Sequence, residues 1–200
     1  MGERKGVTLI EFLIAIAILA IISVVGLLIL NPATYMAKRR DAQRVDDLNV
    51  LQTAINAYIA DHNAAPGRLK TAYRSDCRIW PNGYTNCNTT ASDIQKTDGK
   101  GWIGCPVSSG CNSSDEGFGS SGKLSDYISQ LGIDPKKNSG NNIYLYYNVD
   151  GIKYKIDAKL EVNKSLMAND GGVSLTTYEV GTYKNSCSAS SSSCSLWEST

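Results

Sequence analysis

Histidine is almost absent from this chain of 200 residues, since His62 is the only one. A Ser/His/Asp or Cys/His catalytic arrangement would have to use that residue, and no catalytic motif surrounds it. The glycines between Gly117 and Gly122 lack the lysine and the strand–helix context of a phosphate-binding loop. We therefore predict that the chain is not an enzyme, with no catalytic residue and no cofactor.

An excess of charge of one sign is also missing. The chain has 20 Lys and Arg residues against 19 Asp and Glu residues, a formal net charge of +1. Proteins whose main partner is nucleic acid carry a basic surface that neutralises phosphates. Nucleic acid therefore stays open as a partner, but nothing in the overall charge supports it.

Metal-binding patterns are incomplete throughout the chain. No C-x-x-C pair of the kind that binds zinc occurs. The segments Asn169-Asp170-Gly171-Gly172 and Asp115-Glu116 could supply oxygen ligands, but neither completes an EF-hand loop. We predict no metal site, and a plain turn at residues 169–172.

Cysteines are present in an even number, all beyond the first third of the chain. This distribution favours disulfides that form outside the cytoplasm over a free catalytic thiol. The many pairings that six cysteines allow stay open, and pairing between neighbours is the simplest hypothesis because short loops close at low entropic cost. The neighbouring pairs are Cys77 with Cys87, Cys105 with Cys111, and Cys187 with Cys194.

The N-terminal part contains a long apolar segment. From Phe12 to Leu30 every residue is apolar, Gly or Ala except Ser23. A helix from Val7 to Leu30 would be about 36 Å long, which is enough to cross a bilayer. The segment is too long for an ordinary secretory signal, and the residues after it form a poor cleavage site. A plain membrane anchor fits the length.

A plain anchor leaves Glu11 unexplained. A carboxylate inside an apolar span costs about 2.5–3.5 kcal/mol on insertion scales, so it calls for a role or a partner. Glu11 lies close enough to the start of the segment to reach water at the membrane interface. That position explains how the charge is tolerated, but not the residues around it.

The sequence Gly6-Val7-Thr8-Leu9-Ile10-Glu11, followed by an apolar helix, resembles the prepilin cleavage and methylation motif of the type IV pilin superfamily. The resemblance implies that a membrane peptidase cuts after Gly6 and methylates the new N-terminus at Val7. It also assigns Glu11 to filament assembly. A carboxylate four residues from the new ammonium group can pair with it or with that of a neighbouring copy.

The orientation in the membrane follows from the cysteines. Arg4 and Lys5 precede the span, but Lys38, Arg39, Arg40 and Arg44 follow it, so the positive-inside rule is ambiguous. Disulfides place everything beyond the span outside the cytoplasm. We expect a single-pass protein of the cytoplasmic membrane before assembly, with its C-terminus outside, and an extracellular filament afterwards.

The rest of the chain divides into recognisable segments. We predict a leader over residues 1–6, the apolar helix over 7–30, an amphipathic helix over 31–62, a segment rich in Cys, Gly and Ser over 63–122, and a C-terminal head over 123–200. Pro32 interrupts the helix near Asn31. The amphipathic helix has an apolar face and, mostly opposite it, charged residues. The apolar face comprises Val45, Leu48, Leu51, Ile55, Tyr58 and Ile59, and the charged residues are Arg39, Arg40, Asp41, Arg44, Asp46 and Asp47.

The head is predicted to be a small α+β unit. The spacing of apolar residues indicates a short helix from Lys123 to Leu131. Strands are expected over Ile143–Val149, Ile152–Ala158 and Val173–Val180, with a two-residue turn at Asp150-Gly151. We expect the amphipathic helix to cover this antiparallel sheet. Trp80, Tyr84 and Trp102 are expected to anchor the preceding segment on the head, although that segment could equally serve as a binding surface.

These segments lead to one functional expectation. The head also resembles that of pseudopilins and small pilins, so the chain is expected to be a structural subunit of a type IV pilus or a related surface filament. Its expected partners are copies of itself, prepilin peptidase, the assembly machinery and the cytoplasmic membrane. The alternatives are a pseudopilin of a type II secretion system and a monomeric, membrane-anchored binding protein that would keep residues 1–6.

Overall fold

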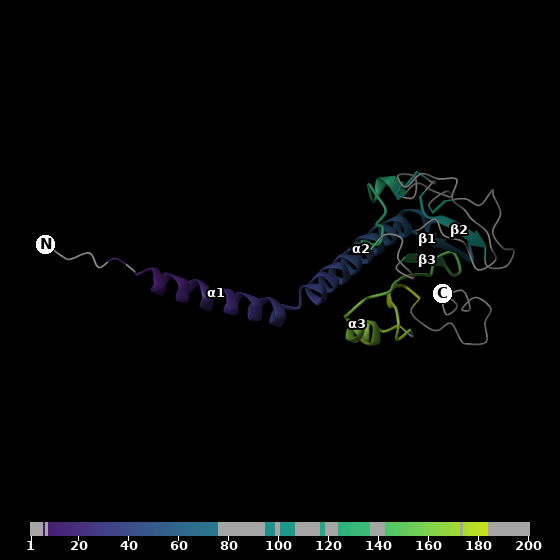
Figure 1. Cartoon of the computed structure of the whole chain (residues 1–200). Helices are drawn as coiled ribbons and strands as arrows, with labels where there is room; N and C mark the ends of the chain where they lie inside the picture. The colour runs from purple at the N-terminus through teal and green to yellow at the C-terminus, as the bar shows by residue number, and fades with distance from the viewer. Residues whose placement is uncertain are drawn as a thin grey trace.

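The computed structural model describes residues 6, 8–75, 95–98, 101–106, 117–118, 124–136, 143–172 and 174–183, and all of their side chains except those of residues 27–30, 103, 105 and 106. Within these residues a helical stem leads into an α+β head (Figure 1). The stem begins with α1 (Leu9–Leu30) and continues as α2 (Pro32–His62). The head adds η1 (Leu124–Asp126), α3 (Lys164–Asn169) and five strands.

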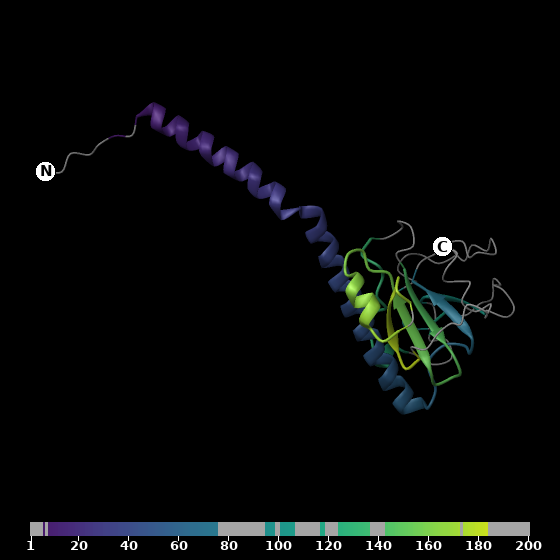
Figure 2. The same cartoon turned by 90° about the horizontal axis from the view of Figure 1, so that it is seen from below.

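The two long helices meet at Asn31, as predicted from Pro32. Asn31 adopts a left-handed backbone with φ 38°, a conformation that Asn tolerates better than most residues. Its side chain accepts a hydrogen bond from the Thr34 backbone N–H, and Pro32 takes the first helical position, where no N–H is needed. The chain therefore bends between α1 and α2, as Figure 2 shows, while both segments stay helical.

The sheet is antiparallel and has the strand order β2-β1-β3-β4-β5. Its strands are β1 (Thr71–Arg74), β2 (Ile103–Pro106), β3 (Tyr144–Asn148), β4 (Tyr154–Ala158) and β5 (Tyr178–Gly181). β1 and β2 lie inside the segment over 63–122, where the sequence analysis placed no strand. β1 pairs with β3, so this segment supplies an inner strand and an edge strand of the sheet.

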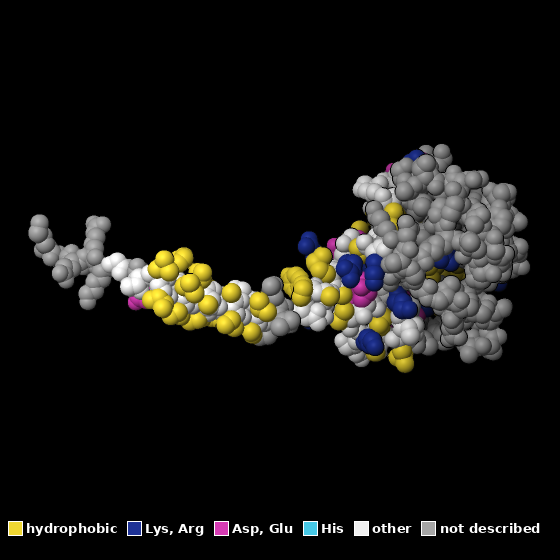
Figure 3. Space-filling view, viewed as in Figure 1, with side chains coloured by type: hydrophobic (Ala, Val, Ile, Leu, Met, Phe, Trp, Pro, Cys, Tyr) yellow, Lys and Arg dark blue, Asp and Glu magenta, His cyan; other side chains and the backbone are white. Residues whose placement is uncertain are grey.

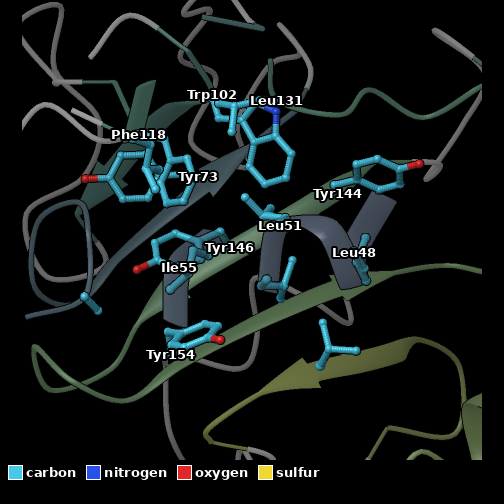
Figure 4. Packing of buried hydrophobic residues seen from close by; sticks show 14 of the residues in the cluster. Leu48, Leu51, Ile55, Tyr73, Trp102, Phe118, Leu131, Tyr144, Tyr146 and Tyr154 are labelled. Atoms are coloured by element: carbon cyan, nitrogen blue, oxygen red, sulfur yellow. The ribbon is translucent and has the colours of Figure 1, made fainter. Parts of the chain in front are cut away.

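The core lies between α2 and one face of the sheet (Figure 2). The predicted apolar face of α2 is confirmed, because Leu48, Leu51, Ile55 and Tyr58 are buried. The sheet contributes mainly aromatic rings, which Figure 4 shows around Leu48, Leu51 and Ile55. Tyr146 and Phe118 lie 4.2 Å apart between ring centroids. Such ring pairs add about 0.5–1.5 kcal/mol each beyond the burial of their area.

Trp102 anchors its segment on the head, as predicted, whereas Trp80 and Tyr84 lie outside the described residues. Its side chain is fully buried, and its indole N–H donates to the Gly132 carbonyl at 3.1 Å. The backbone N–H of Phe118 donates to the carbonyls of Gly101 and Trp102. These bonds hold β2 and the residues that flank it against the core.

The prediction that Asp41 and Arg44 lie on the solvent side of α2 is wrong. Both side chains are fully buried, because each has partners inside the head. Arg44 donates two hydrogen bonds to Asp134, at 2.7 and 3.0 Å, and one each to Asp41 and Glu161, both at 2.8 Å. Arg40 adds two bonds to Glu161. We call Arg40, Asp41, Arg44, Asp134 and Glu161 the buried ion network.

Asp41 also fixes the backbone that leads into α3. Its carboxylate accepts hydrogen bonds from the backbone N–H groups of Glu161, Val162 and Asn163, at 2.8–3.1 Å. The hydrogen bonds from Arg40 are the main cause that lowers the pKa of Glu161 to about 2. The network therefore ties α2 to the segment after β4 and, through Asp134, to the segment after η1.

Two boundaries predicted for the head are wrong. The helix expected over Lys123–Leu131 is a single turn, η1, because the Leu131 N–H donates to Gln95 instead of to its own turn. The strand expected from Val173 begins only at Tyr178, since the Ser174 hydroxyl accepts from the N–H groups of Thr176 and Thr177.

The hairpin between β3 and β4 is confirmed, but its loop is longer than two residues. The Val149 N–H donates to the Lys153 carbonyl, and Asp150 accepts from the N–H groups of Ile152 and Lys153. Gly151, with φ 93°, supplies the left-handed conformation that the loop needs. Asn148 joins this loop to the segment that follows α2 by donating to the carbonyls of Ala65 and Gly67.

Candidate functional site

The candidate site is the N-terminal end of α1, where two polar side chains precede an apolar helix. Thr8 caps α1: the Glu11 N–H donates to the Thr8 hydroxyl at 3.4 Å. Glu11 in turn accepts from the Thr8 N–H at 2.9 Å and from the Thr8 hydroxyl at 3.0 Å. This reciprocal arrangement is a capping box, which satisfies donors that the first turn of a helix leaves unpaired.

The capping box defines where the Glu11 carboxylate lies. It holds the carboxylate against the positive end of the helix dipole, on the first turn, where a negative charge is favourable. Glu11 is the only charged residue of α1. An apolar environment on the following turns would strengthen any interaction of this carboxylate with a cation. The site is thus suited to bind one positive group at the start of the stem.

The other predicted processing residues lie just before the cap. Gly6 is exposed, and no atom lies within 4 Å of the position that a side chain would occupy. An unhindered backbone at this position suits a peptidase that needs an extended segment. Val7 lies outside the described residues, so its role as the new N-terminus and methylation site stays a prediction.

The cysteines are mostly outside the described part of the chain. Cys105 has its backbone in β2, opposite Ala72 of β1. The other five, Cys77, Cys87, Cys111, Cys187 and Cys194, lie outside the described residues. The disulfide hypothesis and its pairing therefore stay predictions.

The helix that follows the site is apolar and uncovered. Its large apolar side chains from Leu9 to Val25 are between 48% and 82% exposed. Residues Leu9–Gly26 are long and apolar enough to cross a membrane, with a mean hydropathy of 2.8 and none of the segment buried. Ser23, its one hydroxyl residue, donates to the Leu19 carbonyl at 2.7 Å and so needs no outside partner. Figure 3 shows apolar side chains along the visible face of α1.

Exposure on this scale has a large energetic consequence. The transfer of one Leu, Ile or Phe side chain from water to an apolar environment is favourable by about 1.5–3 kcal/mol of free energy. The twelve exposed large residues of α1 lie on all sides of the helix. They are Leu9, Ile10, Phe12, Leu13, Ile14, Ile16, Ile18, Leu19, Ile21, Ile22, Val24 and Val25. A helix that is apolar all round is stable only in lipid or surrounded by other apolar helices.

Other polar groups of the described residues form no second site. His62 stacks on Tyr58, with ring centroids 4.1 Å apart, and its Nδ1 lies 3.1 Å from the Tyr58 carbonyl oxygen. Asp170 accepts hydrogen bonds from the N–H groups of Gly172 and Glu179, which closes the turn predicted at residues 169–172. Among the described residues, no three His, Cys, Asp or Glu side chains are arranged to hold a metal ion.

Comparison with known proteins adds one finding. Residues 1–27 match the family model of the prokaryotic N-terminal methylation motif, which is the signal motif of type IV pilins and pseudopilins. No curated protein and no solved structure matches the chain. The motif supports a pilin-like or pseudopilin precursor, a structural subunit rather than an enzyme, and implies processing by prepilin peptidase. The apolar α1 adds membrane anchoring before assembly.

The role of Thr8 is the functional detail that the sequence analysis missed. The residues Thr8-Leu9-Ile10-Glu11 form the T-x-x-E pattern of a capping box directly before an apolar run. That signal was available in the sequence. The resemblance explained Glu11 through the ammonium group at Val7, of its own chain or of a neighbouring copy, and not through a bond to Thr8.

Proposed function

We propose that the chain is cut after Gly6 and polymerises through α1 as a structural subunit of a type IV pilus or a related surface filament. One observation carries the proposal: an apolar helix of 22 residues projects from the head without a covering partner, on a chain that has the prepilin motif. Before assembly the membrane covers this helix. After assembly the α1 helices of neighbouring copies cover one another.

Glu11 has a defined part in this mechanism. Cutting after Gly6 creates an ammonium group at Val7, one residue before the cap. The Glu11 carboxylate neutralises the ammonium group of a neighbouring copy as that copy joins the filament. An unpaired charge within an apolar bundle is costly, so the pairing favours one axial position of the incoming copy over others. Thr8 positions the carboxylate for this contact.

The experiment separates the charge of Glu11 from its capping role. Gln at the same position of a capping box still reaches back to the cap residue, but it carries no charge. We expect Glu11→Gln to be cut as efficiently as the wild type and to form no filaments, because the ammonium group of the neighbour stays unpaired. Processing is measured from the N-terminus of the membrane fraction, and assembly from filaments sheared off intact cells. Thr8→Ser, which keeps the hydroxyl, is the control and should assemble.

Normal filament yield from Glu11→Gln would contradict the charge pairing while leaving the cleavage unaffected. A variant that stays uncut would instead show that Glu11 acts in recognition by the peptidase. If the wild-type chain forms filaments only within the cell envelope, the result would favour the alternative that the chain is a pseudopilin, which builds a short assembly beneath the outer membrane.

A further inference from the structure

The outward face of α2 carries an ordered set of side chains. Ala37, Leu48 and Ile55 are buried and mark the side of α2 that faces the head. With 3.6 residues per turn, the opposite side holds Tyr35, Arg39, Asp46 and Val50. All four are exposed, Tyr35 to 69% and Val50 to 49%. A basic and an acidic residue thus lie on one uncovered helix face, each flanked by an apolar residue one turn away.

The two charged side chains on this face have no partner among the residues that the structure describes. Among the described residues, neither Arg39 nor Asp46 has an ion pair or a hydrogen bond through its side chain. Their neighbours differ in this respect, because Arg40 and Arg44 are bound in the buried ion network. Figure 3 shows charged side chains gathered where α2 enters the head. Arg39 and Asp46 are therefore available to another molecule.

In the proposed filament, copies of this chain meet in a fixed relative orientation. The apolar α1 is long enough to cross a membrane, and under the proposed function it inserts every copy in the same direction, which makes neighbouring stems parallel. Packed helices lie about 8–10 Å apart, which is within reach of Arg and Asp side chains from facing surfaces. A face with both charges can pair with itself only if one copy is shifted along the helix axis relative to the other.

We propose that Arg39 of one copy pairs with Asp46 of the adjacent parallel copy, and that this contact sets their axial stagger. Seven residues separate the two positions, which corresponds to about 10 Å along the helix. The inference rests on the proposed function, because it describes a contact between assembled copies. It adds an electrostatic contact at the level of α2 to the apolar contacts of α1.

The stagger of seven residues is favoured over the unshifted arrangement. Without a shift, Arg39 would face Arg39 and Asp46 would face Asp46, and both contacts are repulsive. With the shift, Tyr35 faces the small Ala42, Arg39 faces Asp46, and Asp46 faces the uncharged Thr53. No like charges meet. An exposed pair contributes only about 0.2–1 kcal/mol, so the contact selects the register more than it strengthens the filament.

The test is a charge exchange between the two positions. Arg39→Glu places two acidic residues opposite each other, and Asp46→Arg places two basic residues opposite each other. We expect each single change to lower the yield of sheared filaments at least about tenfold, because like charges at each repeated contact oppose assembly. The double variant Arg39→Glu/Asp46→Arg restores the pairing with exchanged signs, and its yield should return to within about twofold of the wild type.

Two controls keep the test specific. Arg68→Glu makes the same chemical change at an exposed position beyond the other end of α2, and it should leave the yield unchanged. The thermal midpoint of the detergent-solubilised single variants should match that of the wild type, because surface changes cost little stability. If a charge reversal lowers the thermal midpoint, the neutral variants Arg39→Gln and Asp46→Asn are tested in place of the reversed variants. We expect the filament yield of these neutral variants not to depend on the salt concentration.

The outcomes separate this inference from the proposed function. Wild-type filaments together with a normal yield from either reversal would overturn the Arg39–Asp46 contact alone, and so would a double variant that stays as defective as the singles. A wild type that forms no filaments would overturn the proposed function and, with it, this contact.

Discussion

At the scale of single residues, the most unusual electrostatic feature of the head is a pair of buried carboxylates on neighbouring strands. Asp157 of β4 lies opposite Glu179 of β5, and both side chains are almost fully buried. Lys155 Nζ lies 3.4 Å from Asp157 and also forms an ion pair with Glu179. Asp170 binds the backbone N–H of Glu179. One ammonium group is thus shared by two carboxylates. Burial raises the pKa of Asp157 to about 8, and the opposing effect of the Lys155 charge is smaller.

This pKa predicts how stability depends on pH. Because the pKa of Asp157 is raised in the folded state, the folded protein holds a proton between about pH 4 and pH 8 that the unfolded chain has released. The free energy of unfolding should therefore fall as pH rises through this window, by up to about 1.4 kcal/mol per pH unit, and then level off. Urea denaturation of the detergent-solubilised chain between pH 4 and pH 9 measures this slope.

The control for the pH dependence is Asp157→Asn, which keeps the shape and removes the ionisation. Its unfolding free energy should vary much less across the same window. Glu161 contributes little to this slope, because its stabilising effect is lost only as the pH falls from its ordinary pKa of 4.5 to its folded pKa of about 2. An identical slope in the variant and the wild type would show that another group controls the stability.

At the scale of elements, the buried ion network fixes α2 on the rest of the head. Asp41→Ala removes the acceptor of three backbone N–H groups and one of the partners of Arg44. We expect the free energy of unfolding to drop by about 3–5 kcal/mol, because buried donors and a buried charge lose their partner. Chemical denaturation of the full chain measures it.

Asp46→Ala is the matched change on the same helix. Asp46 is exposed and has no side-chain partner among the described residues, so the unfolding free energy should change by no more than about 0.5 kcal/mol. Equal effects of the two changes would contradict the assigned role of Asp41.

The elements that could be predicted are those with local signals. The break at Asn31 followed from Pro32, the buried face of α2 from spacings of three and four residues, and the hairpin from Asp150-Gly151. Each signal acts within a few residues along the chain. The periodicity of Leu48, Leu51 and Ile55 needed no knowledge of what covers them.

The elements that were missed depend on distant partners. β1 is four residues long and stable only because β2 and β3 flank it, so its own sequence carries little signal. Asp41 and Arg44 look like solvent-exposed charges until residues about 90 positions away or more supply their partners. At the candidate site, Gly6 and Glu11 were predicted from the motif, while the bond to Thr8 needed the capping rule.

At the scale of the whole molecule, the chain is divided between the helix α1, which has no core, and a head whose core is completed by α2. The head buries its apolar residues between α2 and the sheet, whereas α1 leaves all of its described large apolar side chains exposed. A division of this kind is stable only if α1 is covered by lipid or by the α1 helices of other copies. The molecule therefore depends on an environment that a single copy does not provide.

Mass spectrometry of filaments sheared from intact cells tests both cleavage after Gly6 and assembly at the surface. We expect an abundant N-terminal peptide that begins at Val7, with or without a methyl group, in the sheared fraction. The same peptide found only in membranes would contradict the surface filament and favour the pseudopilin. A chain that still begins at Met1 in every fraction would contradict processing and polymerisation together.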